Sequence, residues 1–215
     1  MKMRPRLAGF CFVGLMLLMA FGLTGCSTVV VGTAKMAWED RSTDDQLTDT
    51  KIGAGILSGL ADKDKNLLFD INADVWETRL MLTGTVSDAR IRQSLIQMAR
   101  MDTRIKKIYD EIQVVSLQEQ ARRRDAAKSR DDPKKDAGNR VVNDFWVETK
   151  ISAQLISARE VTSVNYRWRS VRNIIYLIGR AQSKGELKSV LEIIRATEGV
   201  QQVKSFVEIK PLLKS

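Results

Sequence analysis

The eight residues RLMLTGTV at positions 79–86 recur as IIYLIGRA at 174–181, and both stretches have the period-two pattern of a half-buried β-strand. The segments around them recur too: DDQLTDTKI (44–52) matches NDFWVETKI (143–151), and TRIKKIYDEIQV (103–114) matches EGVQQVKSFVEI (198–209). The offset is 99 residues in the first match and 95 in the other two, which predicts four extra residues in one loop of the first copy. Two copies of one small module indicate a binding architecture more than an enzyme.

The order of elements within one copy follows from the spacing of its apolar residues. A first helix is predicted in each copy because apolar residues lie four apart, on one helical face. These residues are Ile52, Ile56 and Leu60 in the first copy, and Val147, Ile151 and Leu155 in the second. Two alternating stretches close enough to form a hairpin follow, then a second helix and a last strand. Each copy is therefore predicted as an α+β module, α-β-β-α-β, with two helices on a three-stranded mixed sheet.

The first 25 residues have the features of a signal peptide. Three basic residues, Lys2, Arg4 and Arg6, precede an apolar run at 7–23, and small residues follow it. A transmembrane anchor is the alternative interpretation. The apolar run is near the lower limit of length for a bilayer span, which favours the signal peptide.

The apolar run ends in Leu-Thr-Gly-Cys, which resembles a bacterial lipobox. Cys26 is therefore expected to carry acyl chains such as palmitate and to become the first residue of the mature lipoprotein. Ser27 stands where aspartate would resemble an inner-membrane retention signal, so the expected location is the periplasmic face of the outer membrane. Residues 26–43 would then form a tether. Cys11 lies in the removed segment, so the mature chain contains no pair of cysteines for an intramolecular disulfide.

The net charge of +9 is unevenly distributed along the chain. The signal peptide contributes +3, residues 27–115 carry −2, residues 116–142 carry +3, and residues 143–215 carry +5. A basic surface attracts anionic lipid, nucleic acid or acidic polymer. The export signal argues against nucleic acid, so we expect a membrane as the partner of the second copy.

The side chains needed for most catalytic chemistry are missing from the sequence. No histidine is present, which removes the commonest general base and the usual zinc ligand. With one acylated cysteine, thiol catalysis is also excluded. We therefore expect no enzymatic activity, no metal, no cofactor and no small-molecule substrate.

A candidate lipid-binding surface lies on the first helix of the second copy. In the 99-residue match, Trp146 takes the position of Leu47, and Lys150 lies one turn later, beside the predicted core stripe. Tryptophan favours the membrane interface, and lysine can meet a lipid phosphate. Arg140 and Arg159 lie near the two ends of this helix. The alternative, that Trp146 only borders the core, is equally compatible with the sequence.

A second candidate surface is the outer face of the second sheet. The residues that alternate away from the predicted core there are Arg167, Arg169, Ile174, Tyr176, Ile178 and Phe206, several of them apolar. The equivalent positions of the first copy are mostly polar. An exposed apolar face on a small sheet normally has a cover. We expect that cover to be the first domain or the linker helix, ahead of an external ligand.

The residue pattern resembles the BON domain family. The likeness rests on the α-β-β-α-β order, the strand ending in L-x-L-x-G, and motifs such as YDEIQ (109–113) and NDxWxxTK (143–150). The hairpin turns lack the Asn-Gly pair common in that family. Two such domains behind a lipobox resemble the dual-BON outer-membrane lipoproteins of the DolP type.

This resemblance implies binding of anionic phospholipid through the first helix of the second domain, and a role in envelope integrity. Alternative functions are an adaptor for an envelope protein machine, and a binder of peptidoglycan or another acidic wall polymer. The domains are expected at 44–115 and 143–210, joined by a charged linker at 116–142 and followed by a tail at 211–215. Leu117 to Ser129 can extend as a helix from the last strand of the first domain.

Overall fold

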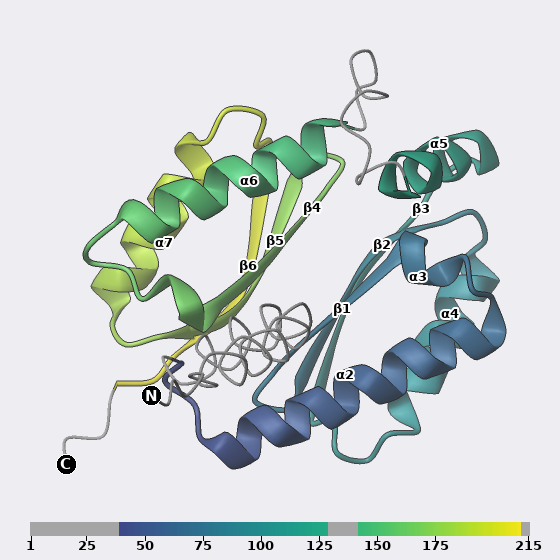
Figure 1. The fold of residues 1–215 in the computed structure, drawn as a ribbon, viewed down its shortest axis with the longest axis horizontal. Coiled ribbons are helices and arrows are strands. Elements are labelled where there is room, and N and C mark those ends of the chain that lie inside the picture. Colours follow the sequence, from purple (N-terminus) through teal and green to yellow (C-terminus); the bar gives the residue numbers. More distant parts are fainter. Residues whose placement is uncertain (1–38, 129–141, 212–215) are drawn as a thin grey trace, which may run out of the picture. The chain divides into compact units, whose positions relative to one another are not determined.

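The computed structural model describes residues 39–128 and 142–211, and the predictions for Cys26 and Arg140 lie outside these residues. The first domain, from α2 to β3, is followed by the linker helix α5 (Figure 1). Its elements are α2 (Thr43–Lys63), α3 (Leu67–Asp70), β1 (Ile71–Trp76), β2 (Arg79–Val86), α4 (Ala89–Arg100) and β3 (Lys107–Val114). Helix α5 spans Leu117–Lys128, where the sequence predicts a helix.

The second domain repeats this order. Its elements are α6 (Val142–Ser157), the short 3-10 helix η2 (Ser163–Asn165), β4 (Tyr166–Val171), β5 (Ile174–Ala181), α7 (Lys184–Ala196) and β6 (Gln202–Ile209). In each domain the central strand pairs antiparallel with the first strand and parallel with the third, giving the orders β1-β2-β3 and β4-β5-β6. The predicted α+β fold class, with two helices on each three-stranded mixed sheet, is confirmed.

The predicted offset of 99 residues for the first helix is wrong, because the offset is 95 throughout. Ile71 pairs with Gly84 as Tyr166 pairs with Gly179. The three core residues of α2 and those of α6 are also 95 residues apart. The four extra residues predicted in a loop of the first copy are therefore not found, because the offset stays at 95 residues from Asp49 and Asp144 to the paired last strands. A shift by one turn keeps an apolar stripe on the same face, so the sequence match does not reveal the error.

The offset of 95 residues gives Trp146 a different equivalent in the first domain. Its structural equivalent in the first domain is Lys51, an exposed residue, and not Leu47. The sequence also does not predict α3, and β4 begins at Tyr166. Residues 163–165 form η2 instead, at the place that α3 occupies in the first domain.

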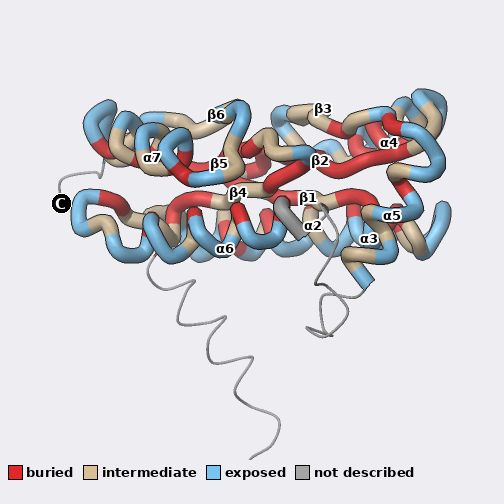
Figure 2. The backbone as a smooth tube through the Cα atoms, turned by 90° about the horizontal axis from the view of Figure 1, so that it is seen from above, coloured by how far each residue is buried: buried red, intermediate tan, exposed pale blue. Residues whose placement is uncertain are grey.

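Each domain has its own hydrophobic core between its helices and its sheet. In the first domain, Ile52, Ile56 and Leu60 of α2 pack on β2 residues such as Leu80 and Leu82. The equivalent residues of α6 and β5 form the core of the second domain. Figure 2 shows that burial is continuous along the central strand β2. The sets of core positions that the sequence indicates are therefore used as predicted.

Two carboxylates hold the hairpin turns, which have no glycine. Glu77 and Thr78 have positive φ angles of 48° and 63°, and both donate their backbone N–H groups to Asp49 of α2, over 2.7 and 2.8 Å. In the second domain Asp144 of α6 accepts the equivalent N–H groups, each over 2.9 Å. A two-residue hairpin turn with positive φ usually contains Asn-Gly. Here a side chain from the first helix stabilises the turn.

The ionised form of Asp144 is favoured by these contacts. Burial would raise the pKa of Asp144, but hydrogen bonds from Ser170, Asn173, Arg172 and Arg123 lower the pKa on balance. A lowered pKa in the folded state means that this group stabilises the fold above the ordinary pKa of aspartate. That contribution is lost as the pH falls through the lowered pKa of the folded protein.

One glycine in each central strand is required by close approach of the backbone. A Cβ added at Gly179, where φ is 152°, would lie 2.2 Å from the carbonyl oxygen of Asn165. At Gly84, with φ of 122°, it would lie 2.0 Å from the carbonyl oxygen of Asp70. These contacts explain the glycine of the L-x-L-x-G pattern, which marks the place where α3 or η2 meets the sheet.

We predict that Gly179→Ala destabilises the protein by about 1–3 kcal/mol or more, because it combines backbone strain with a clash. The measurement is the free energy of unfolding from urea titration. Gly185→Ala in α7 is the matched control, since its nearest neighbour would be an ordinary 3.6 Å away. Equal stability of the two variants would contradict this account of Gly179.

Candidate functional site

The outer faces of the two sheets pack against each other in a surface that we call the seam. Its buried residues come from both domains: Trp76, Met81, Val171, Tyr176 and Ile178. Tyr109, Ile174 and Phe206 are partly buried against them. The two sheets therefore lie between the two pairs of helices (Figure 1).

The seam has approximate two-fold symmetry. Tyr109 of β3 stacks on Phe206 of β6 with ring centroids 4.2 Å apart, and Lys204 of β6 pairs with Glu111 of β3 over 2.7 Å. Tyr109 and Lys204 are equivalent positions, 95 residues apart, and so are Glu111 and Phe206. One contact is thus the symmetry counterpart of the other, as in a homodimer interface. The two domains associate as an internal dimer whose equivalent positions carry different side chains.

An ion pair between equivalent residues lies in the seam. Arg169 of β4 donates two hydrogen bonds to the carboxylate of Asp74 of β1, each over 2.8 Å. Asp74 is 6% exposed. Pairing of two first domains through this surface would bring two aspartates together, and pairing of two second domains would bring two arginines together. The opposite charges therefore favour the contact between unlike domains.

The six residues predicted for the outer sheet face all contact the 39–128 part of the chain. Ile174, Tyr176, Ile178 and Phe206 belong to the seam cluster, and Arg169 pairs with Asp74. Arg167 pairs with Glu39, and its guanidinium lies 5.2 Å from the ring centroid of Trp76. The first domain and the residues just before it cover this face, so these side chains do not form a free surface for an external partner.

Much of the basic charge of the second domain is used in this contact. Six of its cations pair with carboxylates of residues 39–128. The pairs are Arg167 with Glu39, Arg169 with Asp74, Arg172 with Glu119, Arg180 and Lys210 with Glu77, and Lys204 with Glu111. The charge difference between the two copies therefore reflects complementarity between the domains, and by itself it does not indicate a membrane surface.

The outward face of α6 is the remaining candidate site. Phe145, Trp146 and Ile156 are 42%, 54% and 71% exposed. At 100° per residue they lie on the side of α6 opposite its buried stripe. The rings of Phe145 and Trp146 meet edge to face, with centroids 5.9 Å apart. This arrangement forms an apolar stripe, which we call the α6 stripe.

The predicted cations of this site are arranged less simply. Lys150 is half-exposed, and its Nζ lies 2.6 Å from a carboxylate oxygen of Glu198. This contact holds the pKa of Glu198 below its usual range. Arg159 is exposed in the turn after α6, and Arg140 lies outside the described residues. The structure thus places Trp146, Lys150 and Arg159 in or next to α6.

The sequence interpretation missed Phe145 and Ile156. Both lie about half a helical turn from the core stripe, so a projection of residues 142–157 onto a helix could have found them. Within residues 39–128 and 142–211, no helix is both long enough and apolar enough to cross a bilayer.

Comparison with known proteins gives a consistent match. The family model for the BON domain matches residues 48–116 and 143–211, with the 95-residue offset seen in the structure. The uncharacterized protein in the gshII 5′ region of Anaplasma centrale is 31% identical over 144 residues, covering 65% of this chain and 82% of that protein.

Two solved structures of CdsD, a structural protein of the type III secretion system of Chlamydia trachomatis, are also similar. Each covers 74% of this chain, at 12% identity, with TM-scores of 0.29 and 0.28. The alignments cover 91% and 96% of the CdsD chains. At these values the likeness carries no argument about function.

We predict that exchanging the charges of the Asp74–Arg169 pair restores stability that either single change removes. Asp74→Arg and Arg169→Asp each place like charges in the seam, at a cost of about 2 kcal/mol, the lower end for a buried pair, because Arg169 is partly exposed. The double variant recreates the pair at equivalent backbone positions. A double-mutant cycle from urea unfolding measures the coupling. Additive losses in the double variant would contradict a specific pair.

Proposed function

The chain belongs to the BON domain family, and we propose that it is a lipid-anchored envelope protein that binds anionic phospholipid through α6. BON domains are associated with membrane or phospholipid binding and with envelope roles, and BON proteins are generally non-enzymatic binding proteins. Our proposal adds the surface, the lipid class, and an outer-membrane location of the DolP type with a role in envelope integrity.

The α6 stripe is the observation that carries the proposal. Aromatic side chains with an apolar body are favoured at the membrane interface, and Trp146 also has a polar N–H. Phe145 and Ile156 extend this apolar surface along the helix. An amphipathic helix of this kind lies in the plane of the membrane with its apolar side toward the acyl chains.

The affinity for anionic headgroups would come from cations near the α6 stripe. The pair between Lys150 and Glu198 is exposed, and such pairs contribute little to stability, so Lys150 can exchange its partner for a lipid phosphate. Arg159 offers a second cation at the end of α6. A basic residue near an anionic surface contributes about 1 kcal/mol. The binding is therefore weak and suits a domain that a lipid anchor holds close to the membrane.

The surface that the adaptor hypothesis requires is covered by the first domain. Its predicted contact was the outer sheet face of the second domain, and the first domain lies on that face. The α6 stripe is exposed, so a membrane can reach it without separating the domains. We therefore place lipid binding ahead of protein recruitment.

We predict that Phe145→Ser with Trp146→Ser lowers binding to phosphatidylglycerol-containing vesicles roughly tenfold, since two half-exposed aromatic side chains lose their partition into the interface. Flotation of the chain from Ser27 onward measures the bound fraction. Met101→Ser is the matched control, because Met101 is 83% exposed in the turn after α4. Equal loss in the control, or equal wild-type binding to purely zwitterionic vesicles, would contradict the proposal.

We predict that Cys26→Ala abolishes incorporation of radiolabelled palmitate in cells and releases the protein from the outer-membrane fraction. Several acyl chains anchor stably at ~0.8 kcal/mol per buried CH₂, whereas the α6 stripe alone does not. Labelling that persists in the variant, or is absent from the wild type, would refute the lipid anchor and leave the α6 test unaffected.

A further inference from the structure

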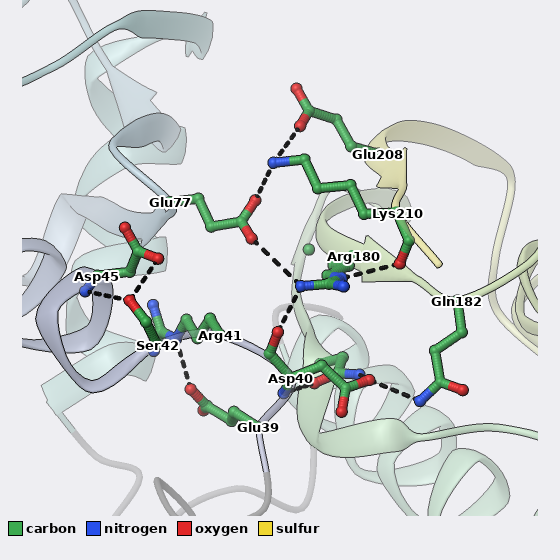
Figure 3. Close-up of polar contacts among 12 residues, drawn as sticks. Glu39, Asp40, Arg41, Ser42, Asp45, Glu77, Arg180, Gln182, Glu208 and Lys210 are labelled. Carbon is green, nitrogen blue, oxygen red and sulfur yellow. Dashed lines mark hydrogen bonds and ion pairs between the residues drawn. The ribbon is translucent and has the colours of Figure 1, made fainter. Parts of the chain in front are cut away.

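Three residues before α2 lie between the two domains and contact both. We call Glu39, Asp40 and Arg41 the clasp. Figure 3 shows them beside Arg180 and Gln182 of the second domain and close to the start of α2. Glu39 is buried, and the other two are partly buried. The N-cap of α2 is the next residue, Ser42, whose side chain accepts a hydrogen bond from Asp45. The clasp is therefore separate from the cap.

Asp40 attaches the clasp to the second domain. Its backbone N–H donates to Asn165 Oδ1 over 2.9 Å, and Asn165 Nδ2 donates back to Asp40 Oδ2 over 2.7 Å. Gln182 Nε2 donates to the same carboxylate over 2.6 Å, and Arg180 donates to the carbonyl oxygen of Asp40 over 2.5 Å. Asn165 is completely buried. Asp40 thus forms hydrogen bonds with both the oxygen and the nitrogen of the buried Asn165 amide, which would otherwise need other partners.

Arg41 attaches the clasp to the first domain. Its guanidinium pairs with Asp49, the carboxylate that stabilises the hairpin turn, and lies 4.3 Å from the ring centroid of Trp76. Gln46 of α2 donates to the carbonyl oxygen of Arg41 over 3.1 Å. Successive residues of the clasp therefore bind different domains.

Glu39 joins the two sets of contacts. One of its carboxylate oxygens accepts from Arg41 over 2.6 Å, and the other pairs with Arg167 of the second domain. Both arginines lie over the ring of Trp76, which is completely buried in the seam. The Glu39 carboxylate thus pairs with one cation from each side of the same interface. Without it, Arg167 would lose its carboxylate partner, and two arginines would remain close to the same ring.

We propose that the clasp locks the two domains together, so that their relative orientation depends on residues that precede both of them. The seam alone pairs the sheets, and the clasp adds polar contacts between the domains from the segment that precedes α2. Pulling on that segment, or cleaving it, therefore changes the contacts at the domain interface. This device is independent of lipid binding, since none of its residues belongs to the α6 stripe.

The clasp lies close in sequence to the expected lipid anchor at Cys26. Thirteen peptide steps separate Glu39 from Cys26. A chain of that length reaches at most about 43–47 Å. In the proposed anchored form, the domain pair is thus attached to the membrane through its own interface. A tether fixed at one flexible domain end would let the second domain move freely.

The test compares interdomain distances in chains with and without the clasp. The chain from Ser27 onward contains no cysteine, so Gln93→Cys on α4 and Lys188→Cys on α7 accept spin labels at exposed, equivalent positions. Pulsed electron spin resonance should give one narrow distance distribution for the full chain. A chain that begins at Ser42 should show a broader distribution with a component at longer distance, and Glu39→Ala with Asp40→Ala should behave alike.

Ser42→Ala is the control, because it weakens the N-cap of α2 and leaves the clasp contacts in place. It should keep the narrow distribution. Circular dichroism and amide chemical shifts of each variant check that both domain cores are folded. If the larger changes unfold a domain, Asp40→Asn is the milder variant, because it keeps one acceptor oxygen, and it should give a distance distribution of intermediate width. An unchanged narrow distribution in the folded Ser42 truncation would overturn the proposal.

Discussion

The opposition of unlike charges across two stacked sheets is the constraint on which the rest of the structure depends. Each sheet has one face covered by its own helices, and the other face is apolar in the second domain. Covering that face requires a second sheet, and the symmetric geometry would accept any copy of the module. Asp74 and Arg169, at equivalent positions, make the contact between unlike domains the favourable one.

This constraint also explains why the second domain is basic. Cations such as Arg169 and Lys204 are partners of carboxylates in the first domain, so the charge difference between the copies is a property of their interface. Surface cations matter for binding elsewhere only if they are left free. The apolar α6 stripe, which the charge pattern does not reveal, then becomes the stronger indication of a membrane-facing surface.

The two domains reach the same hairpin geometry by the same physical means. Asp49 and Asp144 come from the first helix of each copy and bind turns that lack glycine. This links the helix register to the hairpin, and it identifies 95 residues as the true repeat distance. It also connects Asp49 to the clasp, since the same carboxylate binds Arg41, so local turn geometry and domain arrangement share one residue.

The sequence by itself determined the element order, the core positions and the duplication, because apolar periodicity depends only on local geometry. It also indicated that the outer sheet face needs a cover. Only the tertiary structure decided the register of the first helices, since a shift by one turn preserves the apolar stripe and hides the error. The partners of Arg169 and Glu39 were likewise decided only in three dimensions, because residues such as Asp74 and Arg169 are distant in sequence and meet through the stacking of two sheets.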